Sequence, residues 1–121
     1  MHIFIIILAL LSALIHALPA PPNADGRGAT LWTLRAFQGS SVAIPASAWC
    51  TDMNNVFGNF DGKARSLSVE GGYKCQFYTE YGCSAAKGKK LEYGNAKKGV
   101  KVAALTGDFE GKIHSAYCAK I

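Results

Sequence analysis

The side chains that most often carry acid–base chemistry are few and scattered along this chain. His114 is the one histidine beyond residue 20, and it lies in a run with the alternating pattern of a β-strand. No Gly-x-Ser-x-Gly sequence offers it a serine nucleophile. The carboxylates, from Asp25 to Glu110, show no spacing that pairs two of them across a cleft, as glycoside hydrolysis requires. The sequence therefore predicts a non-enzymatic protein, with a small secreted hydrolase as an alternative.

Four cysteines are the next candidates for chemistry, and an even number in a small secreted chain predicts two disulfides. Their spacings are 25, 8 and 35 residues, and there is no Cys-x-x-Cys pair. A structural zinc site is the alternative, but it would have His114 as its single histidine. The residues are Cys50, Cys75, Cys83 and Cys118. The spacing itself leaves all three pairings open.

Positive charge is concentrated in one fifteen-residue window, where six lysines face a single acid, Glu92, and account for the net charge of +5. The six are Lys87, Lys89, Lys90, Lys97, Lys98 and Lys101. Such a group favours anionic surfaces such as microbial membranes or cell walls. The other interpretation is a hydrated surface that keeps the protein soluble. We expect no nucleic-acid partner for a secreted protein, and we expect a monomer.

The N-terminal segment predicts secretion to the extracellular space. Residues 1–17 combine an apolar run with small residues and are typical of a signal peptide, with cleavage after Ala17, or after Ala20 as the second choice. A retained membrane anchor is the alternative. Residues 18–28 are rich in proline and small polar residues, which predicts an extended tail.

An internal repeat organises the remaining chain. Residues 60–66 and 109–115 share the order aromatic, acid, Gly, Lys, apolar, basic, Ser, at an offset of 49 residues. The offset is 46 before a three-residue insertion near residues 85–87, where Trp32 aligns with Tyr78. We therefore predict a single domain over residues 29–121, with motif one at 29–70 and motif two at 71–121.

Each motif contains four short runs rich in β-branched and aromatic residues, separated by turn residues. No window shows the periodicity of a helix. The expected strands are 30–34, 42–44, 50–53, 64–69, 74–78, 91–93, 100–103 and 113–119. This pattern predicts an all-β sandwich or barrel.

The corners of the repeat carry a family resemblance. Motif one has Trp32, Phe37 and Gly39 at a bend, motif two has Tyr78, Cys83 and Gly88, and each bend is followed about 25 residues later by an acid and a serine. A folded-over hairpin needs glycine where φ is positive, an aromatic lid across the bend, and a serine that bonds its backbone. The chain thereby resembles the βγ-crystallin fold, a Greek-key β-sandwich of two four-stranded motifs, and looks similar to small secreted members of that group in fungi.

The resemblance implies the topology and, through it, a disulfide pairing. Each sheet should hold three strands of its own motif and the third strand of the other motif. On that plan Cys50 would lie beside Cys118, and Cys75 would pair with Cys83 across the local corner. The resemblance also raises calcium, bound in this family through Asn/Asp, Asn/Asp, two variable residues, Ser/Thr and Ser. Asp61 and Ser66 match that pattern, but Gly62 and Arg65 depart from it, so we expect no cofactor, with calcium as the alternative.

Secreted proteins of this fold, as the resemblance implies, include killer-toxin-like antimicrobials and proteinase inhibitors. The lysine window favours an antimicrobial or effector role at anionic cell surfaces. The alternatives are a structural or stress-related protein of the extracellular matrix or wall, and a proteinase inhibitor. Most aromatic side chains, Phe57 among them, are expected in the core rather than on a carbohydrate platform. Trp49 and Tyr81 lack aromatic counterparts in the other motif and are the two to check for exposure.

Overall fold

The computed structural model describes residues 25–121, so the predicted signal peptide and most of the predicted tail lie outside the described residues. Every predicted strand is present, with ends shifted by at most four residues. The order is β1 (Arg27–Leu34), β2 (Gln38–Pro45), β3 (Cys50–Asp52), β4 (Ser66–Val69), β5 (Tyr73–Tyr78), the 3₁₀ turn η1 (Tyr81–Cys83), β6 (Lys90–Asn95), β7 (Val100–Val102) and β8 (Ser115–Lys120). Strand β1 begins at Arg27, two residues before the predicted start of the domain. Over residues 25–121, no helix has the length and apolar character needed to span a bilayer.

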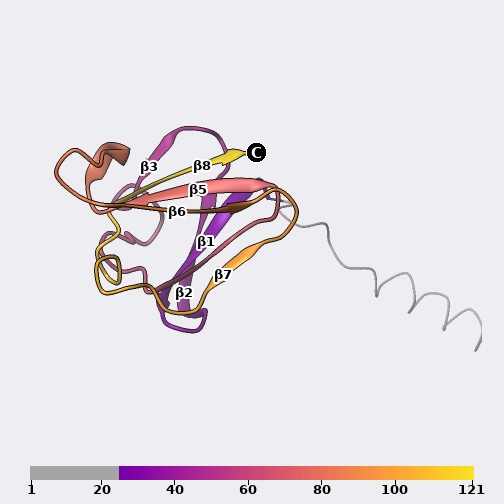
Figure 1. Ribbon diagram of the computed structural model, residues 1–121. Helices are drawn as coiled ribbons and strands as arrows, with labels where there is room; N and C mark the ends of the chain where they lie inside the picture. Colours follow the sequence, from indigo (N-terminus) through magenta and orange to yellow (C-terminus); the bar gives the residue numbers. More distant parts are fainter. Residues whose placement is uncertain (1–24) are drawn as a thin grey trace, which may run out of the picture.

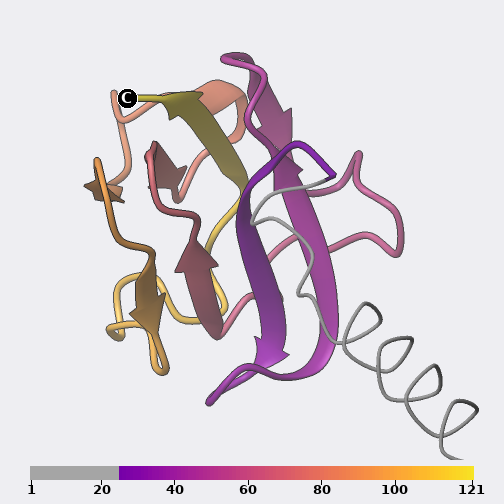
Figure 2. The same cartoon turned by 90° about the vertical axis from the view of Figure 1, so that its right-hand side faces the viewer.

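Two antiparallel four-stranded sheets form the sandwich (Figure 1, and Figure 2 for the view turned by 90°). The first sheet has the order β2-β1-β4-β7, and the second has the order β3-β8-β5-β6. Strand β3 of motif one therefore lies in the sheet of motif two, beside β8, while β7 of motif two lies beside β4. This confirms the exchange of third strands that the resemblance implied.

The core lies between the sheets and follows from the two-residue period of the strands. In β5, Cys75 and Phe77 are fully buried, whereas Lys74 is exposed and Gln76 is half-buried. In β8, Ala116 and Cys118 are likewise buried. The remaining core comes mainly from aliphatic and aromatic residues of both motifs: Ala29, Leu31, Ile44, Met53, Phe60, Ala64, Leu67, Val69, Leu105, Phe109 and Ile113.

The two corners have the same construction, which supports the duplication. The rings of Trp32 and Phe37 lie edge to face, 5.2 Å apart, across the bend of motif one. Gly39 has a φ of +81°, and a Cβ there would come within 2.4 Å of Thr33 Oγ1. Gly88 does not have a positive φ, but its Cβ would also come within 2.4 Å of a threonine hydroxyl, that of Thr79. Glycine is thus required at both positions by close approach.

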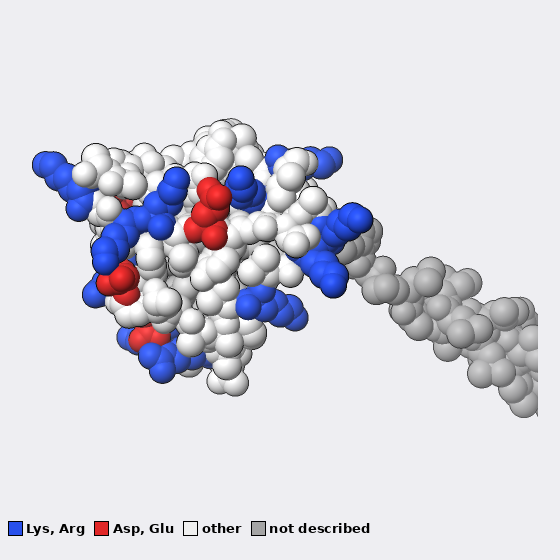
Figure 3. All heavy atoms as spheres, in the orientation of Figure 1, with Lys and Arg blue, Asp and Glu red and all other residues white. Residues whose placement is uncertain are grey.

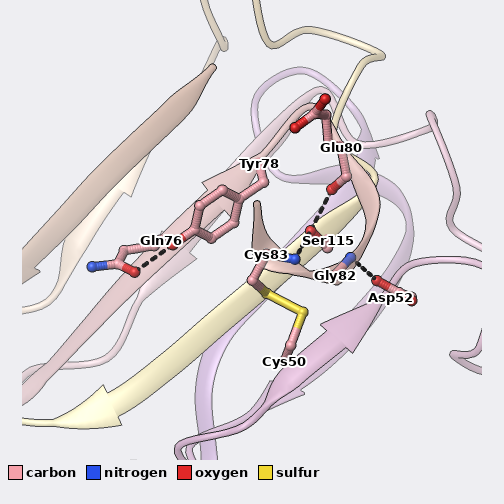
Figure 4. Close-up of a disulfide and its surroundings, with 8 residues drawn as sticks. All are labelled: Cys50, Asp52, Gln76, Tyr78, Glu80, Gly82, Cys83 and Ser115. Atoms are coloured by element: carbon pink, nitrogen blue, oxygen red, sulfur yellow. Dashed lines mark hydrogen bonds between the residues drawn. A yellow bond between two sulfur atoms is a disulfide. The ribbon is translucent and has the colours of Figure 1, made fainter. Parts of the chain in front are cut away.

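Buried serines hold both corners through the backbone, as predicted from the repeat. The Ser66 hydroxyl donates a hydrogen bond to the Leu34 carbonyl oxygen at 2.6 Å and accepts one from the Phe37 amide at 3.1 Å. The Ser115 hydroxyl donates to the Glu80 carbonyl oxygen at 2.5 Å and accepts from the Cys83 amide at 2.9 Å (Figure 4). Each serine therefore satisfies one donor and one acceptor of the folded hairpin.

The predicted disulfide pairing is wrong: the bonds join Cys50 to Cys83 and Cys75 to Cys118. Cys75 and Cys118 are directly opposite each other in the β5–β8 ladder, with Cα atoms 4.1 Å apart and both side chains buried. The partner of Cys50 in the β3–β8 ladder is Tyr117, one residue away from Cys118. Because neighbouring side chains point to opposite faces of a sheet, Cys50 faces outward and cannot reach Cys118. It bonds instead to Cys83 of η1, which folds against β3 (Figure 4).

Candidate functional site

The two residues with a resemblance to calcium ligands are already engaged within the protein. Ser66 is fully buried, and its hydroxyl is used by the hairpin backbone. One Asp61 oxygen, Oδ1, lies 2.5 Å from His114 Nδ1, and the other accepts a hydrogen bond from the Tyr81 hydroxyl. Within residues 25–121, no group of three or more His, Cys, Asp or Glu side chains could hold a metal ion. A hard cation needs six or more oxygen ligands, so these residues do not fit calcium.

Asp61, His114 and Tyr81 form a cluster that joins the two motifs, and we call it the titratable clasp. Asp61 lies between β3 and β4 of motif one, whereas Tyr81 lies in η1 and His114 directly before β8. The rings of Tyr81 and His114 contact each other, with centroids 5.1 Å apart. Burial opposes ionisation of Asp61, but the hydrogen bonds from Tyr81 and His114 outweigh it and hold the pKa of Asp61 below its usual value. The bond to Asp61 also raises the pKa of the Tyr81 hydroxyl.

An equivalent cluster, the arginine clasp, occupies the corresponding position with the motifs exchanged. Glu110 of motif two receives two hydrogen bonds from Arg35, at 2.6 and 2.9 Å, and lies 3.5 Å from Arg65. The hydrogen bonds from Arg35 hold the pKa of the Glu110 carboxyl below its usual value.

The two clasps follow the same offsets as the repeat. Asp61 matches Glu110 and Arg65 matches His114 at 49 residues, while Arg35 matches Tyr81 at 46. The sequence thus contained this correspondence, although neither motif shows it when read alone. One clasp is held by guanidinium groups, which are permanent cations, and the other by an imidazole and a phenol. In both clasps, positive or hydrogen-bond-donating groups stand where a bound cation would need oxygens.

His114 has the carboxylate partner of a catalytic histidine, but no nucleophile accompanies it among the described residues. The neighbouring hydroxyl, Ser115, is fully buried and bonded to the backbone of Glu80 and Cys83. All four cysteines are in disulfides. A pocket beside β4 and β7 is lined by one carboxylate, that of Glu70, and by one amine, that of Lys101. Glycoside hydrolysis by paired acids needs two carboxylates, so this pocket does not fit that reaction.

The lysine window divides into separate groups instead of forming one continuous face. Lys90 begins β6 opposite Tyr78, with Lys87 and Lys89 just before it, whereas Lys97 and Lys98 follow the far end of the strand. A six-residue strand separates these groups by about 20 Å. Lys101 lies on β7 in the other sheet. Figure 3 shows the corresponding spread, with Lys and Arg groups at both ends of the molecule in this view.

Three aromatic side chains of the described residues are largely exposed. Of the two aromatics that lacked counterparts in the other motif, Trp49 is 63% exposed and Tyr81 is 48% exposed, so neither is a core residue. Phe57, expected in the core with most other aromatics, is 98% exposed because it lies in the loop between β3 and β4. The signal that could have placed it outside is its neighbours, since the turn residues at 54, 55, 58 and 59 are asparagine or glycine.

The sheet topology and the paired corners match the two-motif Greek-key fold of βγ-crystallin domains. The N-terminal domain of protein S has a TM-score of 0.61 at 18% identity, over 78% of this chain and 97% of its own. A domain solved in work on the evolution of the eye-lens βγ-crystallin fold has a TM-score of 0.65 at 19% identity, over 87% and 95% of the two chains. A βγ-crystallin domain from Flavobacterium johnsoniae has a TM-score of 0.59 at 15% identity, over 76% and 93%.

These neighbours establish that the chain has the βγ-crystallin fold. No protein-family model and no curated protein matches the sequence.

Proposed function

We propose that this chain is a secreted, non-enzymatic protein that acts at anionic cell surfaces through its lysine window, in an antimicrobial, killer-toxin-like or effector role. The observation that carries the proposal is the availability of these amines. All six lysines of the window are exposed, and among the described residues only Lys89 has an ion pair, with Asp108 at 3.0 Å. Exposed ammonium groups on a rigid sandwich can bind anionic lipid or wall polymers.

The disulfides of the described structure also support an extracellular location. Two disulfides close separations of 33 and 43 residues, and such bonds persist in oxidising compartments. The alternative function, a structural or stress-related protein of the matrix or wall, would use the same scaffold with lysines that serve solubility alone. A proteinase inhibitor is the second alternative.

Charge reversal separates the leading proposal from the structural alternative. We would compare two variants from the window, K87E/K90E and K97E/K98E, with a control that reverses two exposed lysines elsewhere, K112E/K120E. All three variants change the net charge equally. Sedimentation with vesicles that contain phosphatidylserine should show weaker binding for at least one window variant than for the control. Equal binding by all three variants and the parent would exclude a role for the window, and the structural alternative would replace the proposal.

A further inference from the structure

Three large aromatic side chains are exposed to solvent on η1 and on the segments that are bonded to it. These are Trp49, Phe57 and Tyr81, which we call the aromatic edge. A single exposed apolar residue needs no explanation, but three exposed aromatics on segments bonded to one short turn indicate an interaction surface. Phe57 is nearly fully exposed, so its ring contributes almost nothing to the stability of the isolated chain.

The segments that carry Trp49 and Phe57 are connected to η1 by a disulfide and by hydrogen bonds of neighbouring residues. Trp49 precedes Cys50, which is disulfide-bonded to Cys83 in η1 with a Cα separation of 5.8 Å. Tyr81 is the first residue of η1. The Asp52 carboxylate, on the N-terminal side of the Phe57 loop, accepts a hydrogen bond from the Gly82 amide at 2.8 Å (Figure 4).

The base of the Phe57 loop is also closed from its other side. Asp61 accepts the hydrogen bond from Tyr81, and the Phe60 amide donates to the Met53 carbonyl oxygen at 3.0 Å. The base of the loop is therefore fixed by bonds on both sides, and Phe57 is exposed on a closed loop.

The backbone around Phe57 decides which kind of partner fits. A proteinase cleft binds its ligand as an extended segment. The two residues that follow Phe57 instead have positive φ, +82° at Gly58 and +49° at Asn59, which turns the chain sharply. A protruding ring on a tight loop can enter a deformable partner such as a lipid bilayer more readily than a rigid cleft. Aromatic side chains also favour the interface between lipid head groups and acyl chains.

Charges of both signs lie around the aromatic edge. Three carboxylates, those of Asp52, Asp61 and Glu80, accept hydrogen bonds but keep their negative charge, so attraction to lipid phosphate depends on the lysines that follow η1. Lys87 and Lys90 follow η1 in the chain and are exposed, without an ion pair among residues 25–121. Aromatic insertion and lysine attraction can therefore act at the same end of the molecule.

We infer that the aromatic edge inserts into the interface of anionic lipid bilayers, with Lys87 and Lys90 beside it. This inference rests on the proposed function and deepens it, because it names a lipid bilayer as the surface and η1 as the end that meets it. Lys97 and Lys98, at the other end of β6, then remain away from the membrane.

The test uses the mature, disulfide-bonded chain and vesicles of phosphatidylcholine with phosphatidylserine. The Phe57→Ser variant should partition about tenfold or more weakly than the parent, because it loses the transfer of an aromatic side chain. Leu34→Ser is the matched control, because Leu34 is 51% exposed at the β1–β2 hairpin, away from η1. It should bind as the parent does.

Tryptophan emission reports insertion directly. Trp49 emission should shift to shorter wavelength on vesicle binding and be quenched by brominated lipid. The Trp49→Phe variant, which retains Trp32 packed against Phe37, should show no shift. If Phe57→Ser binds like the parent and no emission shift occurs while K87E/K90E still weakens binding, the inference is overturned and the proposed function stands. If no lysine reversal changes binding, the proposed function itself is overturned.

Discussion

Replacing Ser66 with alanine should destabilise the fold far more than the loss of one small polar group suggests. The hydroxyl of Ser66 is fully buried and makes two hydrogen bonds, to the Leu34 carbonyl oxygen and from the Phe37 amide. Alanine removes both bonds and leaves a backbone donor and acceptor of the folded hairpin without partners. Water cannot replace the hydroxyl without opening the corner, because Trp32 and Phe37 pack across it.

The size of the effect follows from these two bonds. Each intramolecular hydrogen bond contributes about 1 kcal/mol net, so Ser66→Ala should lower the free energy of unfolding by about 2 kcal/mol. For a domain of this size, each kcal/mol corresponds to about 4–8 °C in melting temperature. The expected fall is therefore about 8–16 °C, and Ser115→Ala should cost a similar amount because its hydroxyl makes the equivalent bonds.

The assay is urea denaturation and thermal melting of the parent and the variants. Ser68→Ala is the matched control, because Ser68 lies on the same strand, β4, is half-buried, and makes no side-chain hydrogen bond among residues 25–121. It should change stability by less than about 0.5 kcal/mol. The reasoning fails if Ser66→Ala and Ser68→Ala melt together, since the hairpin would then not depend on the buried hydroxyl.

Three further predictions concern the disulfides, the titratable clasp and calcium. Removing the Cys75–Cys118 bond with alanines should cost about 4 kcal/mol for its separation of 43 residues, and peptide mapping of the oxidised parent should link Cys118 to Cys75 and never to Cys50. Because the folded-state pKa of Asp61 is lowered, its ionised form stabilises the fold above the unfolded-state pKa, and this contribution is lost as pH falls through the folded-state pKa. The Asp61→Asn variant should therefore melt with a weaker pH dependence on the acid side, and an unchanged dependence would contradict the clasp. Calcium or a chelator should leave the melting temperature unchanged, and a rise with calcium would show a site that these residues do not reveal.

The strands could be predicted because they depend on features that recur in the sequence, whereas their exchange between sheets was implied by the resemblance to the βγ-crystallin fold. A two-residue period marks each strand, and the offsets of 46 and 49 residues show which parts of the two motifs correspond. The serines could also be predicted, because a short side chain at the same point of both motifs has the same backbone to satisfy.

The disulfide pairing could not be predicted from strand order, because it depends on register. Shifting a pairing by one residue turns a side chain to the other face of the sheet, and Cys50 lies opposite Tyr117 rather than Cys118. The exposure of Phe57 could have been predicted from the asparagine and glycine residues around it, but the backbone bond that closes its loop, from the Phe60 amide to the Met53 carbonyl oxygen, has no such pattern. The partners of Asp61 lie 20 and 53 residues away and meet only after the two motifs pack together.

The exchange of third strands also sets the order in which this chain can reach its final state during synthesis. Strand β3 has its ladder with β8, the last of the described strands, and β4 gains its second neighbour, β7, from motif two. When motif one has just left the ribosome, it has neither a complete sheet nor a partner for Cys50, which bonds to a cysteine of motif two. Both sheets are completed only when residues from 100 onward are available. Neither motif can therefore complete a sheet from its own strands, and both sheets depend on the two motifs being present together.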